Sequence, residues 1–205
     1  MDVAIVIPAR YKSSRFPGKP LAKIKGKPMI IRVADICSKV IENHKIFVAT
    51  DSKIISSVVE KYNYNVIFTN KNNLTGTDRV AEAAKKIDAK IIVNVQGDEP
   101  LLNYKDIIKV INEKKKNFNQ VINAYCPLSS HEKENNINIP KLVINEKNEL
   151  IYMSRKAIPG IKDLSKKTTF LKQVCIYAFN KSELNKFKNY GRKSKTEKFE
   201  DIEIL

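Results

Sequence analysis

Residues 3–21 read VAIVIPARYKSSRFPGKPL, and this stretch decides how the rest of the chain can fold. Residues 3–7 form a short run of apolar and β-branched residues, which predicts a buried β-strand. The run breaks at Pro8 into a loop that contains a Pro-Gly turn signal. This loop carries four cations: Arg10, Lys12, Arg15 and Lys19. A buried strand that runs directly into a basic loop predicts an anion site at the carboxyl edge of a sheet.

The basic loop suits a polyphosphate. Arginine forks match phosphate oxygens and lysine acts as a point charge, so Arg10, Arg15 and Lys19 can converge on one such group. The GxxxxGK[ST] pattern of ATPases is absent. A solvated basic loop is the alternative. The position directly after the first strand, with Pro17 and Gly18 fixing the backbone, favours the anion site.

Strands and helices alternate through the first half of the chain. Apolar runs predict strands at residues 3–7, 46–50, 65–68 and 91–95. Helical patterns cover residues 29–40, 52–62, 79–87 and 104–116. Pro28 is expected to be the first helical residue of one helix, and Asp51 to cap the next. Continuous apolar strands predict an α/β fold, a mainly parallel, Rossmann-like nucleotide-binding sheet flanked by helices.

The second half changes character. Strands are predicted at residues 121–125 and 171–179, and a hairpin at residues 141–145 and 150–154, so antiparallel pairing is added to the parallel sheet. Residues 198–205 resemble the start of an amphipathic helix, after which a further C-terminal segment is expected to be missing. No linker separates the halves. We therefore predict one domain, 1–205, with a nucleotide-binding half at 1–118 and a mixed half for sugar binding and dimerisation at 119–205.

Composition excludes several classes of protein. The 205 residues carry a formal net charge of +16, but the excess lysine is scattered and no nucleic-acid-binding motif is present, so nucleic acid is not an expected partner. No apolar run is long enough to cross a membrane, and no signal-peptide pattern opens the chain. A cytoplasmic location without membrane binding is the expectation.

A second polar motif, QGDEP at residues 96–100, follows the fourth predicted strand. A carboxylate such as Asp98, facing a phosphate site, is the arrangement that holds Mg²⁺. Capping of the following turn is an equal alternative when the motif is considered alone. The basic loop and QGDEP together favour one site that holds both phosphate and metal.

A third motif, TGTDR at residues 75–79, offers a glycine that lets a ligand approach the backbone. Capping of the next helix by Thr77 or Asp78 is as well supported as a ligand role. No Ser-His-Asp or Cys-His pattern is recognisable in the chain, so no nucleophile is predicted. Catalysis would rest on positioning and charge neutralisation, as in nucleotidyl or phosphoryl transfer.

Taken in order, seven motifs resemble the 3-deoxy-manno-octulosonate cytidylyltransferase (CMP-Kdo synthetase) family: IPARYKSSRFPGKPL, VATD, GTDR, NVQGDEPL, the NxNxxK pattern at 136–141, YMSRKAIP and FEDIEIL. The resemblance covers essentially the whole chain. It implies a fold of the nucleotide-diphospho-sugar transferase type and a homodimer. It also implies Mg²⁺-dependent transfer of CMP from CTP to the anomeric hydroxyl of Kdo or a similar acidic sugar, with pyrophosphate released, for lipopolysaccharide precursor synthesis.

The resemblance also implies roles for matching residues of the nucleotide site. The catalytic set consists of three phosphate-binding cations and one Mg²⁺ ligand: Arg10, Arg15, Lys19 and Asp98. Further substrate-binding positions, near the cytosine and toward the sugar acid, are Pro8, Ala9, Thr77, Arg79 and Gln96.

For the sugar acid, the resemblance implies cations at Lys141 and Arg155, which with Arg79 would neutralise the carboxylate, and an acceptor for hydroxyls at Glu200. Gln173 and Tyr177 match further pocket positions. The family usually has His and Gly where this chain has Gln173 and Cys175, and a glutamine cannot be cationic. Nucleotidyl transfer to another sugar acid and an inactive nucleotide-binding homologue are the alternative functions.

Overall fold

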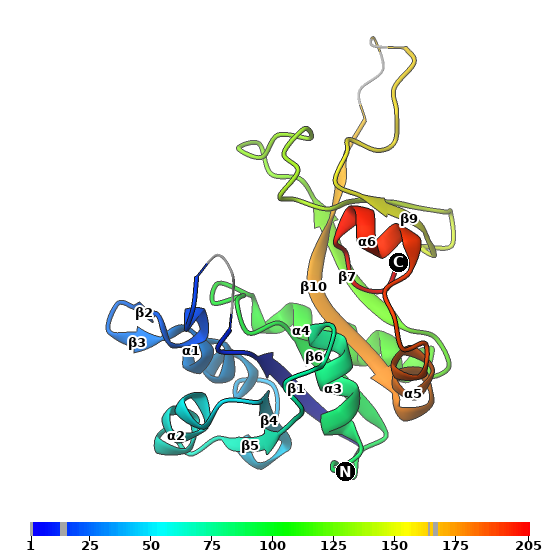
Figure 1. Cartoon of the computed structure of the whole chain (residues 1–205). Helices are drawn as coiled ribbons and strands as arrows, with labels where there is room; N and C mark the ends of the chain where they lie inside the picture. The colour runs from blue at the N-terminus through cyan, green and yellow to red at the C-terminus, as the bar shows by residue number, and fades with distance from the viewer. Residues whose placement is uncertain (1, 13–15, 164, 166–167) are drawn as a thin grey trace. The chain divides into compact units, whose positions relative to one another are not determined.

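A computed structural model describes residues 2–12, 16–163, 165 and 168–205 (Figure 1). Arg15, one of the predicted phosphate ligands, lies outside the described residues. The chain forms two compact units. The first contains Met1–Ile122 and Cys175–Gly191, and the second contains Asn123–Val174 and Arg192–Leu205. The second half of the chain therefore contributes to both units, and the predicted single domain with halves 1–118 and 119–205 stays a prediction.

The first unit is built on a mainly parallel sheet, which confirms the predicted α/β fold. Its strand order is β5-β4-β1-β6-β10, with β1 in the middle and only β10 antiparallel to its neighbour (Figure 1). Every residue of β1 is buried, as its apolar sequence requires. The strands are β1 (Val3–Ala9), β4 (Ile46–Thr50), β5 (Asn65–Phe68), β6 (Ile91–Val95) and β10 (Leu171–Asn180). The part of β10 before Cys175 belongs to the second unit.

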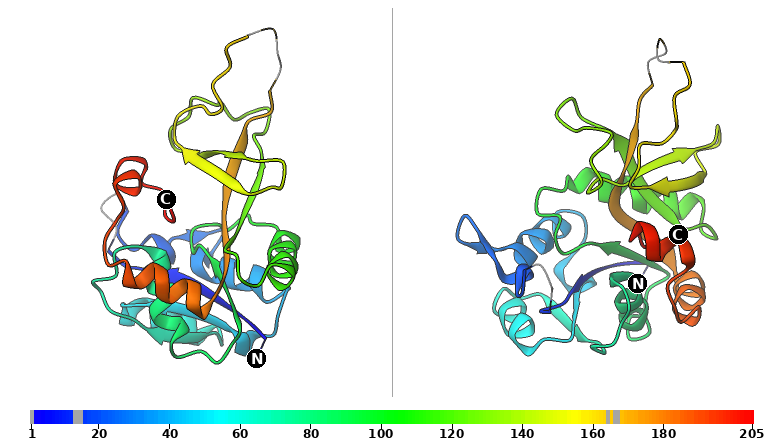
Figure 2. Two further views of the ribbon diagram at one scale, coloured as in Figure 1. Left: turned by 90° about the vertical axis from the view of Figure 1, so that its right-hand side faces the viewer. Right: turned by 45° about the horizontal axis from the view of Figure 1, so that its top comes forward.

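In the part of the chain that the structure describes, the sheet is covered by the helices α1 (Met29–Cys37), α2 (Lys53–Lys61), α3 (Gly76–Ala84), α4 (Tyr104–Lys116) and α5 (Lys181–Asn189). Figure 2 (left) shows α3 and α5 side by side on one face and α4 on the other. Short elements near the basic loop and before β4 are η1 (Lys19–Leu21), β2 (Lys23–Ile24), β3 (Lys27–Pro28) and η2 (Asn43–Lys45).

Three predicted helix starts were wrong. Pro28 has extended backbone, pairs in β3 and precedes α1 instead of opening it. Ser52, not Asp51, caps α2, because its side chain accepts a hydrogen bond from the Ile55 amide. Helix α3 begins at Gly76, three residues before the predicted start, because Thr75 and Asp78 form a capping box there.

A buried ion pair joins α4 to α5 within the first unit. The Lys114 side chain is fully buried, and its Nζ donates to both carboxylate oxygens of Glu183, at 2.8 and 2.6 Å, and to the Gln120 carbonyl at 2.6 Å. Burial lowers the pKa of Lys114, and the Glu183 carboxylate opposes that shift. Pairing makes this burial of charge tolerable.

The second unit is small and antiparallel. Its hairpin, β8 (Lys141–Ile144) and β9 (Leu150–Ser154), confirms the prediction, and β8 also pairs with the first residues of β10. Strand β7 (Ile122–Pro127) pairs with β10. A small core forms around Leu142, Met153 and Ile202.

The predicted amphipathic helix at 198–205 was wrong. The helix in this region is α6 (Lys195–Glu200), and Asp201 adopts a left-handed conformation with φ of 47° that ends it. The chain then turns so that Ile202 enters the core of the second unit, whereas Phe199 is 89% exposed. Among the described residues, no helix is both long and apolar enough to span a membrane.

Candidate active site

Three polar loops leave the carboxyl ends of the parallel strands of the first unit, and parallel strands bring such ends to one edge. Arg10 follows β1 and is exposed, after the buried residues Pro8 and Ala9. Asp51 follows β4, and Gln96, half-buried, follows β6. The edge therefore gathers polar side chains from segments that are far apart in the sequence.

Lys19 and Asp98 meet at this edge. The Lys19 Nζ lies 2.7 Å from the Asp98 Oδ2, and both side chains keep more than two fifths of their surface exposed. Lys19 begins η1 after Gly18, whose positive φ of 71° and amide bond to the Tyr11 carbonyl close the basic loop. An ion pair this exposed contributes at most about 1 kcal/mol to folding. The pair matters for the chemistry of the site and not for stability, because it places one cation and one carboxylate together in an open site.

Gly97 explains how the QGDEP loop approaches β1. A Cβ at this position would lie 2.9 Å from the Pro8 carbonyl oxygen and 3.0 Å from the Ile30 Cδ1, closer than a side chain tolerates. The loop therefore packs directly against the end of β1. No role for Gly97 was predicted, although a glycine directly after a buried strand indicates such a close approach.

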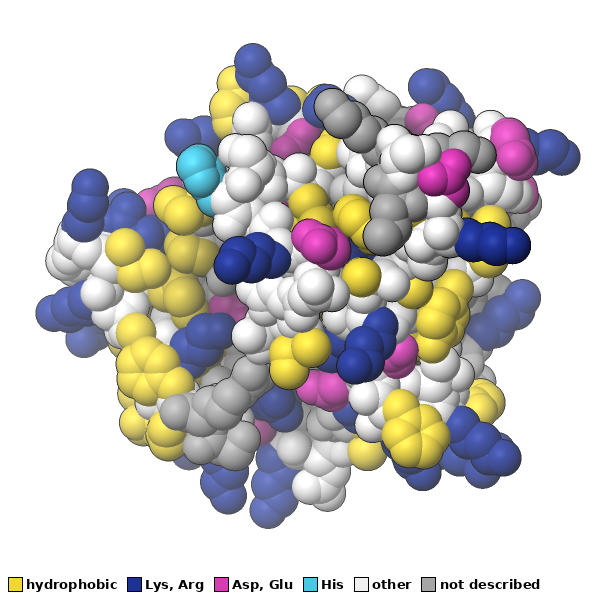
Figure 3. Space-filling view, turned by 90° about the horizontal axis from the view of Figure 1, so that it is seen from above, with side chains coloured by type: hydrophobic (Ala, Val, Ile, Leu, Met, Phe, Trp, Pro, Cys, Tyr) yellow, Lys and Arg dark blue, Asp and Glu magenta, His cyan; other side chains and the backbone are white. Residues whose placement is uncertain are grey.

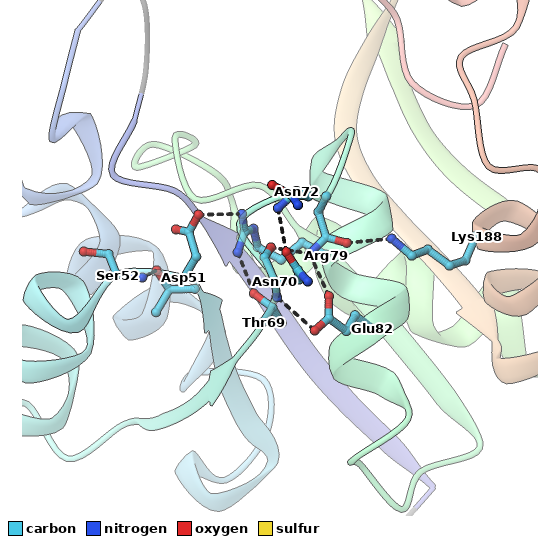
Figure 4. Close-up of polar contacts among 10 residues, drawn as sticks. Asp51, Ser52, Thr69, Asn70, Asn72, Arg79, Glu82 and Lys188 are labelled. Carbon is cyan, nitrogen blue, oxygen red and sulfur yellow. Dashed lines mark hydrogen bonds and ion pairs between the residues drawn. The ribbon is translucent and has the colours of Figure 1, made fainter.

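Arg79 ties three segments together (Figure 4). Its side chain is buried, its Nη1 donates to the Thr69 Oγ1 at 2.5 Å, and its Nη2 lies 3.3 Å from the Asp51 Oδ2. The guanidinium thus joins α3 to the ends of β4 and β5. Asp51 and Thr69 were not predicted as its partners, because they come from two other strand ends.

The TGTDR motif serves the start of α3. Asp78 accepts from both the backbone amide and the hydroxyl of Thr75, each at 2.9 Å, so Asp78 is a capping residue. Thr77 does not cap. It is fully buried, and its Oγ1 accepts from the Asn94 side chain of β6 at 3.3 Å. The Nζ of Lys188 in α5 donates to the Asn73 side chain at 2.7 Å.

A second cluster lies in the second unit around Glu200. Its carboxylate accepts from the Ser154 hydroxyl at 2.7 Å, the Arg155 amide at 2.8 Å and the Tyr152 hydroxyl at 3.2 Å. Burial alone would raise the pKa of Glu200, but these hydrogen bonds and the Arg155 charge outweigh it and lower the pKa. Glu200 is therefore an ionised hydrogen-bond acceptor.

Two of the three predicted sugar-acid cations are held by main-chain carbonyls. Arg155 donates to the carbonyls of Glu200, Ile137 and Asp201, the last two at 2.9 and 2.8 Å. Lys141 is fully buried and donates to three carbonyls, including that of Arg155. The structure thus brings Lys141, Arg155 and Glu200 together.

Two other predicted sugar-site residues are buried in strand β10. Gln173, in the second unit, is 9% exposed and donates to the Asn123 side chain at 3.3 Å. Tyr177, in the first unit, is 3% exposed and stacks with Phe179 at 6.2 Å between ring centroids.

The charge of the chain does not form a single basic face in the view of Figure 3, where lysine and arginine side chains are spread around the surface among other types. Among the residues that the structure describes, no three His, Cys, Asp or Glu side chains are grouped so that they could hold a metal ion.

Comparison with known proteins identifies the family. The family model described as cytidylyltransferase matches residues 4–205. A 3-deoxy-manno-octulosonate cytidylyltransferase from Polynucleobacter necessarius subsp. necessarius is 41% identical over 184 residues, which is 87% of this chain and 72% of the relative. The enzyme of the same name from Escherichia coli is 34% identical over 203 residues, or 98% of this chain and 81% of the relative.

Solved structures support the same family. CMP:2-keto-3-deoxy-manno-octonic acid synthetase complexed with CTP aligns with a TM-score of 0.89 and 34% identity, over 99% of this chain and 83% of that chain. A cytidylyltransferase from Leptospira borgpetersenii, at 18% identity and a TM-score of 0.62 over 96% of this chain and 67% of that chain, shares the fold. The chain belongs to the cytidylyltransferase family, on the branch of the 3-deoxy-manno-octulosonate cytidylyltransferases.

Proposed function

We propose that this chain transfers CMP from CTP to the anomeric hydroxyl of 3-deoxy-manno-octulosonate and releases pyrophosphate. The relatives at 34–41% identity carry that name, and the structural relative at a TM-score of 0.89 was solved with CTP. The observation that carries the proposal is the 2.7 Å contact between Lys19 and Asp98, because it joins the basic loop and the QGDEP loop in one site. The proposal extends to a homodimer in the cytoplasm.

The side chains of the first unit would act by binding and orienting the triphosphate. Lys19 and the exposed Arg10 would hold the β- and γ-phosphates and stabilise the negative charge of the leaving pyrophosphate. Arg15 keeps its predicted role in the same set. Pro8 and Ala9 would border the cytosine. In this chemistry the sugar hydroxyl itself attacks the α-phosphate, so no protein nucleophile is required.

Asp98 fits a magnesium ion that arrives with the nucleotide. Mg²⁺ in nucleotide sites is commonly bound by one or two carboxylates together with substrate phosphates and waters. Asp98 is an exposed carboxylate next to a phosphate-binding cation, and it needs no second protein carboxylate for this role. Bound there, Mg²⁺ would reduce the charge of the triphosphate. On nucleotide binding, Lys19 would exchange the Asp98 carboxylate for phosphate.

The second unit would bind the sugar acid. The ionised Glu200 is an acceptor suited to sugar hydroxyls, and its three donors fix its orientation. The Arg155 guanidinium, which bonds the Glu200 carbonyl, adds positive charge close to it, which favours an acidic sugar. Gln173 would supply a neutral hydrogen-bonding group. The proposed substrate-binding set also includes residues of the first unit: Thr77, Arg79, Gln96 and Tyr177.

Steady-state pyrophosphate release in the variants Asp98→Ala and Lys19→Met tests the proposal. Loss of a single group that stabilises the transition state typically costs about 100- to 1,000-fold in rate, so we expect losses of that order at saturating Mg²⁺. Lys109→Met, which removes an exposed lysine of α4, is the matched control and should keep the wild-type rate. An Asp98→Ala enzyme with wild-type turnover would overturn the assignment of the metal ligand.

A further inference from the structure

Lys141 has an ammonium group that is saturated by the protein. Its side chain is fully buried at the start of β8, and Nζ donates to the carbonyls of Asn136 at 2.9 Å, Ile139 at 2.7 Å and Arg155. An ammonium group has three N–H donors and no acceptor, so three carbonyls use all of them. No donor is left for a sugar carboxylate while these bonds are in place.

The carbonyls come from two segments, the loop at residues 136–140 and the end of β9. The Arg155 guanidinium adds a further bond to this loop, at 2.9 Å from the Ile137 carbonyl. The loop contains no strand or helix. The Ile137 side chain is 60% exposed, so its packing does not hold the loop in place. The main chain of this loop is also held by a turn bond from the Ile139 amide to the Asn136 carbonyl at 3.1 Å. The Gln173 amide of β10 donates to the Pro140 carbonyl at 3.0 Å. The cations add further bonds to the main-chain carbonyls of this loop.

The same bonds reach Glu200 through the backbone of Arg155. Lys141 fixes the Arg155 carbonyl, and the Arg155 amide donates to the Glu200 Oε2 at 2.8 Å. The guanidinium of Arg155 also bonds the carbonyls of Glu200 and Asp201. Lys141 thus lies at one end of a chain of bonds that ends on the carboxylate proposed to bind sugar hydroxyls. Burial and the Arg155 charge lower the pKa of Lys141, and Glu200 opposes the shift.

We propose that Lys141 is a positioning residue that acts through the main chain. It holds the loop 136–140 and the backbone of Arg155 so that Glu200 is presented to the sugar hydroxyls, and it makes no contact with the sugar carboxylate. The part that concerns the sugar rests on the proposed function. The bonds of Lys141 belong to the free protein and can be measured without any substrate.

Two substitutions separate hydrogen bonding from charge. Lys141→Met keeps most of the length of the side chain and removes every donor, whereas Lys141→Gln removes the charge and keeps two N–H donors. Hydrogen exchange of peptides that cover residues 133–140 is measured in the free protein, followed by KM for Kdo, kcat and the Kd for CTP. Lys147→Met, at an exposed position in the hairpin turn, is the control for loss of one positive charge.

The proposal predicts that exchange in residues 133–140 becomes at least about 10-fold faster in Lys141→Met, with Lys141→Gln in between, because each bond to a charged donor contributes about that factor or more. KM for Kdo should follow the same order, while the Kd for CTP stays within about 2-fold of wild type. Lys147→Met should match wild type in every measurement.

Equal increases in KM for both variants with unchanged loop exchange would overturn the proposal, because that result indicates direct charge contact with the sugar. If Lys141→Met does not fold, Lys141→Gln decides: faster exchange with a raised KM supports the proposal, and a raised KM alone overturns it. A wild-type protein that does not turn over Kdo would contradict the proposed function, and the exchange measurement would still decide whether Lys141 holds the loop.

Discussion

Replacement of Arg79 by methionine should destabilise the first unit more than breaking a closer but exposed ion pair. The Arg79 side chain is 4% exposed, and its guanidinium lies 3.3 Å from Asp51 and 2.5 Å from Thr69. Lys109 of α4 lies only 3.0 Å from Asp106, but its side chain is 79% exposed. Distance alone ranks the second pair as stronger, whereas burial ranks the first as stronger.

The expected loss in the free energy of unfolding follows from the charge of Asp51, which the substitution leaves unpaired. Removal of one partner from a buried pair costs about 3–5 kcal/mol, because the remaining charge is left unpaired. Asp51 keeps 19% of its side-chain surface exposed, and 3.3 Å is long for such a pair, so we expect about 2–3 kcal/mol for Arg79→Met. For a chain of this length each kcal/mol lowers Tm by about 2–4 °C, which gives a decrease of about 4–12 °C.

Thermal unfolding followed by circular dichroism measures this difference. Lys109→Met should lower Tm by less than about 4 °C, since exposed pairs contribute about 0–1 kcal/mol. Asp51→Asn should resemble Arg79→Met, and the double variant should lose less than the sum of the two single losses. A Tm of Arg79→Met within about 2 °C of wild type would refute the reasoning that burial determines the strength of this pair.

Three further predictions concern other parts of the chain. Gly97→Ala should weaken CTP binding measured by calorimetry by about 10-fold or more, since the new methyl group displaces the QGDEP loop from Pro8; unchanged affinity would contradict this. Because the pKa of Glu200 is lowered from its ordinary value of 4.5, its ionised form persists above that value and is lost only as the pH falls through the lower folded-state pKa. Titration of Glu200 should therefore leave KM for Kdo flat between about pH 5 and 8, and an inflection that Glu200→Gln removes would disprove it. Lys114→Met should lower the free energy of unfolding in urea by about 3 kcal/mol, and a loss below about 1 kcal/mol would mean that the buried Glu183 is compensated by other groups.

The sheet of the first unit could be predicted because its strands are continuous apolar runs bounded by polar loops. The run at 91–95 gave β6, and the alternation with helices gave the parallel order that brings Lys19 and Asp98 to one edge. Family resemblance supplied the chemistry that periodicity could not, including the identity of the anion.

Other features of the fold could not be predicted, because they depend on helix caps, main-chain carbonyls and backbone conformation. Helix α5 was not predicted, because its sequence KSELNKFKN is mostly polar, although Asn180 and Glu183 form a capping box at its start. The acceptors of Lys141 are main-chain carbonyls, and the end of α6 depends on a left-handed residue that is not glycine, Asp201. Such positions are set by tertiary packing, so a pattern of residue types carries little information about them.

The most direct test of the central claim is identification of the product formed by the wild-type protein. Purified protein is incubated with Kdo, MgCl₂ and each of the four nucleoside triphosphates, and pyrophosphate and the nucleotide-linked sugar are measured together. We expect CMP-Kdo and pyrophosphate in equal amounts with CTP, and little pyrophosphate release with the other nucleotides. Binding of CTP without pyrophosphate release would contradict it, as would equal release with every nucleotide.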